Sequence, residues 1–123
     1  MTRSELTNLF IRKTELFNSE QLLASLKESY SVATESGFSE NLERNIFELE
    51  QKIARERAAS ARDRETALQT LTRIEDDAGS VGAMLHYLEG MPWDVAAALL
   101  RYISGNALRA AAYRGMNAAK IAK

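Results

Sequence analysis

The sequence predicts an all-α protein, and three observations lead to this prediction. The 123 residues include only one proline and six glycines, so few positions interrupt a helix. No stretch alternates polar and apolar residues as a half-buried strand does. Apolar residues recur instead at steps of three, four and seven, which places them on one face of a helix.

The composition limits the classes of protein to which the chain can belong. With 46% hydrophobic residues and a net charge of −1, the chain is too apolar and too nearly neutral to be disordered. The absence of cysteine excludes a disulfide framework, a thiolate metal site and a cysteine nucleophile. The longest apolar run, residues 95–100, is far shorter than the roughly 20 residues of a membrane span, and no apolar signal peptide follows Met1. We therefore expect a soluble, cytoplasmic protein.

The first segment predicts a hairpin of two short helices. Thr2 and Glu5 have the spacing of a capping box, which opens a helix over about 4–17. Asn18 is a candidate cap for a second helix, and Gly37 can adopt the left-handed conformation that ends it. The apolar stripes of the two helices are formed by Leu6, Leu9, Phe10, Leu16 and Phe17 and by Leu22, Leu23, Leu26, Tyr30 and Ala33.

The segment from Ser39, a candidate cap, to Asp77 contains no glycine or proline and predicts a long amphipathic helix. A helix of this length would extend roughly 57 Å, more than the width of a small domain. Either it pairs with a second chain, or the chain folds back near residues 58–60. We favour the single helix because no turn-forming residue stands in the middle. A coiled-coil seam at an oligomer or partner interface is predicted for Leu42, Ile46, Leu49, Ile53, Leu68 and Leu71.

Beyond this segment the composition changes, so we divide the chain into domains 1–78 and 79–123. The glycines at 79 and 82 are expected to break the helix. An alanine-rich cluster of short helices should follow, over about 83–89, from Pro92 to Gly105, and from Asn106 to residue 114. Asn117 can cap a final turn through residue 121.

Residues that support catalysis are sparse. His86 is the only histidine and has no partner nearby in the sequence that would orient it as a general base. The acidic residues 75–77 are adjacent and point in different directions on a helix, so we expect a solvated helix end rather than a metal site. No phosphate-binding glycine loop, serine elbow or paired zinc ligands occur. The sequence therefore predicts no enzyme, no metal and no cofactor.

The C-terminal end is basic. Residues 91–123 hold five basic side chains against Asp94 alone, a local charge of +4. Five of these residues follow a pattern: a small residue, a glycine four positions later, an apolar residue, a polar cap and a later aliphatic residue. They are Ala111, Gly115, Met116, Asn117 and Ile121. This stretch resembles the middle of a helix-turn-helix motif of DNA-binding proteins. The resemblance implies nucleic-acid contacts by Arg109, Arg114, Asn117, Lys120 and Lys123.

Two functions fit this sequence. The first is a non-catalytic interaction module, a regulator, adaptor or chaperone that self-associates through the long helix, as a homodimer, and binds a protein partner. Trp93, beside a proline at a helix start, is the candidate partner contact. The alternative is a small DNA-binding regulator that uses the basic C-terminus.

Overall fold

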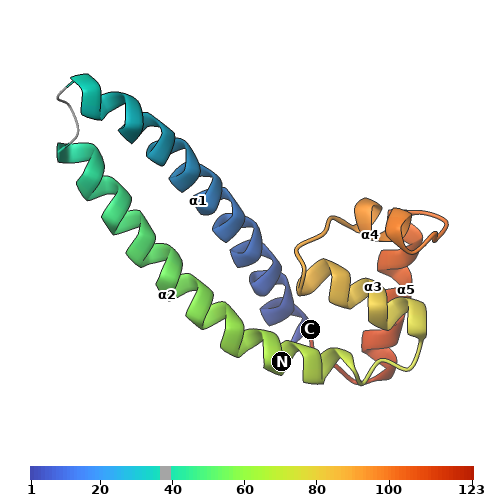
Figure 1. The fold of residues 1–123 in the computed structure, drawn as a ribbon. Helices are drawn as coiled ribbons and strands as arrows, with labels where there is room; N and C mark the ends of the chain where they lie inside the picture. The colour runs from blue at the N-terminus through green and yellow to red at the C-terminus, as the bar shows by residue number, and fades with distance from the viewer. Residues whose placement is uncertain (37–39) are drawn as a thin grey trace. The chain divides into compact units, whose positions relative to one another are not determined.

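The computed structural model describes the backbone of residues 1–36 and 40–123, and the side chains of these residues except 33–36. This part of the chain contains helices and no strand, which confirms the all-α prediction. It forms two compact units, here called the core unit (1–13 and 60–123) and the hairpin (14–59). The helices are α1 (Arg3–Ser36), α2 (Glu40–Leu71), α3 (Asp77–Tyr87), α4 (Trp93–Leu99) and α5 (Gly105–Ala118) (Figure 1).

The beginning of α1 confirms one sequence prediction, and its length corrects another. Thr2 N donates to Glu5 Oε1 at 3.2 Å and Glu5 N donates to Thr2 Oγ1 at 3.1 Å, which is the predicted capping box. The predicted hairpin over 4–36 is wrong, because α1 continues through Asn18. A single asparagine inside a helix costs only about 0.7 kcal/mol relative to alanine, too little to end it. The expected caps at 37 and 39 lie outside the described residues.

The second long helix, α2, passes through residues 58–60 without a break, so the preferred single helix is confirmed. However, it ends at Leu71 and not at Asp77. Asp76 is the N-cap of α3, since its Oδ2 accepts a hydrogen bond from Gly79 N at 2.9 Å. The acidic residues therefore begin a helix, where carboxylates favour the positive end of its dipole, rather than end one.

The hairpin pairs α1 and α2 in antiparallel directions. Glu20 bonds to Arg57 at 2.9 Å, and Lys27 bonds to Glu50 at 3.3 Å. The second pair lies seven residues further along α1 and seven residues back along α2. Ion pairs that recur after one heptad on both helices are typical of a two-stranded coiled coil. Within this unit the helices therefore bury their apolar faces against each other.

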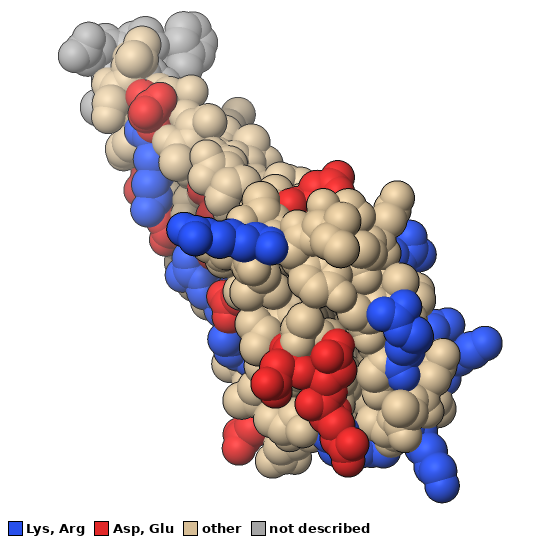
Figure 2. All heavy atoms as spheres, turned by 90° about the vertical axis from the view of Figure 1, so that its right-hand side faces the viewer, with Lys and Arg blue, Asp and Glu red and all other residues tan. Residues whose placement is uncertain are grey.

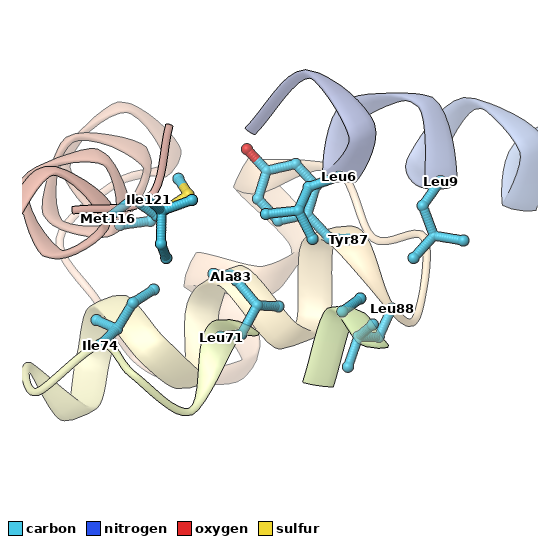
Figure 3. Packing of buried hydrophobic residues seen from close by; sticks show 11 residues of the cluster. Leu6, Leu9, Leu71, Ile74, Ala83, Tyr87, Leu88, Met116 and Ile121 are labelled. Atoms are coloured by element: carbon cyan, nitrogen blue, oxygen red, sulfur yellow. The ribbon is translucent and has the colours of Figure 1, made fainter. Parts of the chain in front are cut away.

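The core unit encloses the main hydrophobic cluster. Leu6 of α1, Leu71 of α2 and Met116 of α5 are fully buried, and Tyr87 of α3 is 1% exposed. Figure 3 shows these side chains converging from four different helices. The chain ends also meet here, because Arg3 N donates to the Ala122 carbonyl oxygen at 2.7 Å. The first turn of α1 thus obtains an acceptor for one of its unpaired N–H groups.

The glycines at 79 and 82 lie inside α3, so the predicted break there is wrong. A Cβ atom on Gly79 would stand 2.9 Å from the carbonyl oxygen of Ala111. On Gly82 it would stand 2.6 Å from Leu108 Cδ1. These glycines are required because α3 and α5 approach too closely for any side chain, not because the chain turns.

Residues 111–121 do not form the predicted helix-turn-helix, because α5 continues through Gly115 to Ala118. Gly115 does not end a helix; a Cβ there would lie 2.5 Å from Ile74 Cγ2, so the glycine again permits close packing. The predicted cap Asn106 is replaced by Ser104, whose Oγ accepts from Ala107 N at 3.1 Å. The second, recognition helix expected from Asn117 therefore does not form in this fold.

Candidate interaction surface

The short helix α4 is held against α5 by small side chains. Ala96 is fully buried and Ala97 is 2% exposed, and both pack in one cluster with Leu108 of α5. Because alanine occupies little space, the backbones of the two helices come close together. This packing fixes which residues of α4 face outward.

The outward residues are large and apolar. Val95 is 51% exposed and Leu99, one turn later on the same face, is 62% exposed. Ile103, in the turn that leads to α5, is 92% exposed. We call these three residues the α4 surface. Burying one such side chain fully would stabilise the protein by about 1.5–3 kcal/mol. Within the described residues these three side chains stay exposed and do not gain this stabilisation.

Arg101, between Leu99 and Ile103, has a backbone conformation that favours glycine. Its φ is 55°, and it occupies the left-handed position of a helix-ending motif in which Tyr102 N donates to the Ala97 carbonyl oxygen at 2.8 Å. The same motif ends α5 at Lys120, where φ is 58° and Ile121 N donates to the Met116 carbonyl oxygen at 2.9 Å. A non-glycine residue in this region costs roughly 1–2 kcal/mol, which a basic charge at a helix C-terminus offsets only in part.

The segment of the sequence that carries the α4 surface is basic. Asp94 is the only acid in residues 91–123, and its carboxylate lies directly against Gly105 at the start of α5. There the negative charge is compensated by the helix N-terminus. Beyond Asp94 the chain carries only basic charges. Figure 2 shows a group of acidic side chains on the same face of the molecule as several basic ones.

An aromatic stack connects α4 to α3 and α1. The His86 ring lies between Phe10, at a centroid distance of 4.2 Å, and Trp93, at 4.0 Å. Tyr87 meets the His86 ring edge-on at 4.8 Å. His86 Nδ1 is 2.6 Å from the Met91 carbonyl oxygen, to which the neutral ring donates a hydrogen bond. The first residue of α4 is therefore held by ring contacts as well as by the backbone.

The electrostatics of this stack are those of a packed interior. Burial lowers the pKa of His86, and the positive charge of Arg109 lowers it further. Burial raises the pKa of Tyr87 well above its ordinary value, and the neighbouring Tyr113 hydroxyl adds to this effect. Trp93 is half-buried and contacts Tyr113 edge-on at 6.4 Å. These ring contacts hold the first turn of α4 in place. That the protein is not an enzyme stays a prediction.

A cavity of about 530 Å³ lies elsewhere in the core unit, between the α2–α3 connection and α5. Its polar groups are already partly engaged: Arg73 Nη2 donates to the Ala119 carbonyl oxygen at 2.6 Å, and Asp76 caps α3. Arg114 and Glu75 also line it, so charges of both signs face the same space. The lining therefore favours no single class of charged ligand.

The residues predicted for the long-helix interface lie in different environments. Ile53 is 2% exposed, and Leu71 is fully buried in the core unit. Leu68 is 41% exposed and lies outside the hydrophobic cluster. Half-buried positions are occupied by Leu42, Ile46 and Leu49. Since α1 pairs with this part of α2, the apolar seam has a partner within its own chain, and dimerisation stays a prediction.

The residues predicted to contact nucleic acid are not gathered on one helix face. Arg109 Nε donates to the Tyr113 hydroxyl at 3.1 Å, and its guanidinium lies 5.1 Å from the centre of that ring. Arg114 and Asn117 are exposed on α5. Lys120 follows α5 with φ of 58°, and Lys123 is exposed at the end of the chain. Nucleic-acid binding by these residues stays a prediction.

No pattern in the sequence indicated the α4 surface as a site. The sequence predicts a helix that runs through Val95, Leu99 and Ile103, without indicating which of its faces is packed. The signal was present in the alternation of large residues with alanines, but it was ambiguous. Large apolar residues usually face the core, whereas here the alanines do so because α5 lies so close.

Comparison of the chain with known protein families, with curated proteins and with solved structures found no match. Among the described residues, no helix is long and apolar enough to cross a membrane. Within the same part of the chain, no group of three or more histidine, aspartate or glutamate residues is arranged to hold a metal ion.

Proposed function

We propose that the protein is a non-catalytic helical interaction module, a regulator, adaptor or chaperone, that binds a protein partner through the α4 surface. The observation that carries this proposal is the exposure of Val95, Leu99 and Ile103 within nine consecutive positions, 95–103. Single exposed apolar residues are ordinary, whereas a local group on a well-packed support is typical of an interface.

Other exposed apolar residues support this choice by contrast. On the hairpin they are Phe17, Leu22 and Val32 of α1 and Phe47 of α2. The α1 residues fall at three different positions of the heptad, so they do not form one stripe. The long helix, in turn, uses its seam to pair with α1. Recognition is therefore better placed on α4 than on the long helix.

The proposal is tested by photo-crosslinking in the cells that produce the protein. A benzoylphenylalanine at position 99 should give one discrete adduct, whose partner is identified by mass spectrometry. The matched control is position 68 on α2, a leucine with comparable exposure (41% against 62%) outside the α4 surface. Ile103→Asp should remove the adduct at position 99. Equal adducts at both positions, or no adduct at position 99, would contradict the proposed function.

A further inference from the structure

The cavity between the α2–α3 connection and α5 has the size of a small-molecule site. Its volume of about 530 Å³ is within the range of about 300–1,000 Å³ that is usual for ligand pockets. Its lining comes from three places along the chain: the α2–α3 connection, Tyr102 after α4, and α5 with the residue that follows it. All of these residues belong to the core unit, so the cavity is complete within one compact unit.

On the α5 side, the lining consists largely of small residues. Ala111, Gly115 and Ala118 follow one another at steps of four and three, so they share one face of the helix. None of them has side-chain atoms beyond Cβ, so this face leaves the space in front of it open. Small residues alone give a ligand little to recognise, and the chemistry of the cavity therefore depends on its charged residues.

Two charged residues of the lining are held in place by the fold. Arg73 Nη2 donates to the Ala119 carbonyl oxygen at 2.6 Å, and Asp76 Oδ2 accepts from Gly79 N at 2.9 Å. A guanidinium has five N–H donors and a carboxylate has two acceptor oxygens, so each group can form further hydrogen bonds beyond these contacts. The cavity therefore has one basic and one acidic group that are already positioned.

Glu75 and Arg114 line the same cavity with opposite charges, yet they do not pair with each other. Among the described residues, neither side chain forms an ion pair or a hydrogen bond. Both residues are exposed, so water hydrates their charged groups. A ligand that displaces this water must replace its hydrogen bonds with charge-assisted ones. Glu75 is therefore available to a cationic group of a ligand, and Arg114 to an anionic group.

This combination of charges selects the chemistry of the ligand. A simple anion such as phosphate would meet Glu75 and Asp76, and a simple cation would meet Arg73 and Arg114, so each would be repelled as well as attracted. A molecule that carries both charges satisfies both pairs. We propose that the cavity binds a small zwitterion of the amino-acid type, whose carboxylate is bound by the arginines and whose ammonium group is bound by the acidic residues.

Tyr102 extends this inference to the rest of the ligand. It is half-buried and packs against the cluster formed by Ala96, Ala97 and Leu108, so its ring is held in place. A ring fixed in this way offers apolar and aromatic side chains a contact surface. We therefore expect an amino acid with an aromatic side chain, either free or at the start of a dipeptide. The α4 surface does not line this cavity, so the inference is independent of the proposed function.

The test is an NMR titration of the ¹⁵N-labelled full chain with L-phenylalanine, in which the backbone amide shifts report affinity and location. The dissociation constant should be about 0.1–1 mM, and the largest shifts should occur at Gly115, Ala118 and Ala119. N-acetylphenylalanine keeps only the negative charge and phenylalanine amide only the positive one, so each should bind about tenfold more weakly. Equal binding of the three compounds, shifts confined to other residues, or no binding of phenylalanine up to about 10 mM would overturn the proposal.

A dipeptide distinguishes the two sources of this chemistry. Phenylalanylglycine carries the same two charges further apart than phenylalanine does. Tighter binding of phenylalanine would assign the cavity to free amino acids, and tighter binding of phenylalanylglycine would assign it to short peptides. Either result supports a zwitterion as the ligand.

Variants of the protein test the predicted contacts. Arg114→Gln and Glu75→Gln each remove one charge and should weaken phenylalanine binding by about tenfold. The matched controls are Arg109→Gln on α5 and Glu65→Gln on α2, which replace exposed residues outside the cavity and should change binding by less than about twofold. Equal losses in the controls would assign the effect to the net charge of the protein and overturn the proposal.

The two variants should also recognise different groups of the ligand. In Arg114→Gln, phenylalanine should lose its advantage over phenylalanine amide, which lacks the carboxylate, but keep its advantage over N-acetylphenylalanine. In Glu75→Gln, the two outcomes should be reversed, because the lost contact is with the ammonium group. A variant that only disturbs the fold would weaken all three compounds alike, and that result would refute these contacts.

Discussion

Gly79→Ala should destabilise the core unit, although alanine favours a helix more than glycine does. Residue 79 lies in the first turn of α3, where the sequence alone suggests that replacement of the glycine would be harmless or helpful. The structure predicts the opposite, because the backbone of α5 occupies the space that a Cβ atom needs. The carbonyl oxygen of Ala111 would be 2.9 Å away and its carbonyl carbon 3.2 Å away.

The magnitude follows from three contributions. Helix propensity favours alanine by at most about 1 kcal/mol. Overpacking against a backbone that cannot rotate away costs about 1–3 kcal/mol. The Cβ would also lie 2.9 Å from Asp76 Oδ2, and disturbing the cap that this oxygen forms costs about 1 kcal/mol more. The net loss is therefore roughly 1–3 kcal/mol in the free energy of unfolding.

Urea unfolding followed by the fluorescence of Trp93, the only tryptophan, measures this loss, because the ring lies in the core unit. Ala110→Gly, at an exposed position of α5, is the control and should cost about 1 kcal/mol through propensity alone. If Gly79→Ala instead raises stability by the amount that Ala110→Gly loses, α3 and α5 do not pack as closely as described. The reasoning about glycine would then be refuted.

Two further predictions concern the same unit. Leu71→Ala should lower the free energy of unfolding by roughly 2–5 kcal/mol, because its side chain is fully buried. Leu68→Ala on the same helix, where the side chain is 41% exposed, should change it by less than about 0.5 kcal/mol. Urea titrations that give similar losses for the two variants would contradict this difference in burial. The lowered pKa of His86, due to burial and then to Arg109, means that the unfolded state binds a proton more readily than the folded state. Stability should therefore be full above the ordinary pKa of 6.5 and decrease as the pH falls below it. Unfolding of the protein and of His86→Phe at about pH 7.5 and pH 5.5, followed by Trp93 fluorescence, checks this; an unchanged pH dependence in the variant would assign it to other groups.

Helical periodicity and the capping box predicted the all-α class, the long helix α2 and the start of α1 correctly, because these features depend on local sequence. The wrong predictions concern residues that were interpreted as helix boundaries. Asn18 was interpreted as a boundary, and Gly79, Gly82 and Gly115 as breaks, yet all four lie inside helices. A glycine that permits close contact between helices looks the same in a sequence as one that permits a turn, and only the distant residue, such as Leu108, distinguishes them.

The candidate surface was harder to predict for a related reason. Sequence patterns show that one face of α4 is rich in alanine and the other in larger residues, but not which face meets α5. The usual preference places Leu99 inward, and the close approach of α5 reverses it by admitting only Ala96 and Ala97. The conformation of Arg101 was equally hidden, because a basic residue after a helix gives no indication of a left-handed backbone.

The recurrence of the ion pairs Glu20–Arg57 and Lys27–Glu50 after seven residues on both helices has a consequence for the length of the hairpin. Each heptad is a layer of about 10 Å, and removal of one layer from both helices leaves the remaining layers facing their original partners. A deletion of two residues from one helix alone would instead rotate the rest of that helix by about 200° and turn its apolar face away. The reach of this hairpin can therefore change during evolution only in discrete, matched steps, while the core unit retains its own contacts.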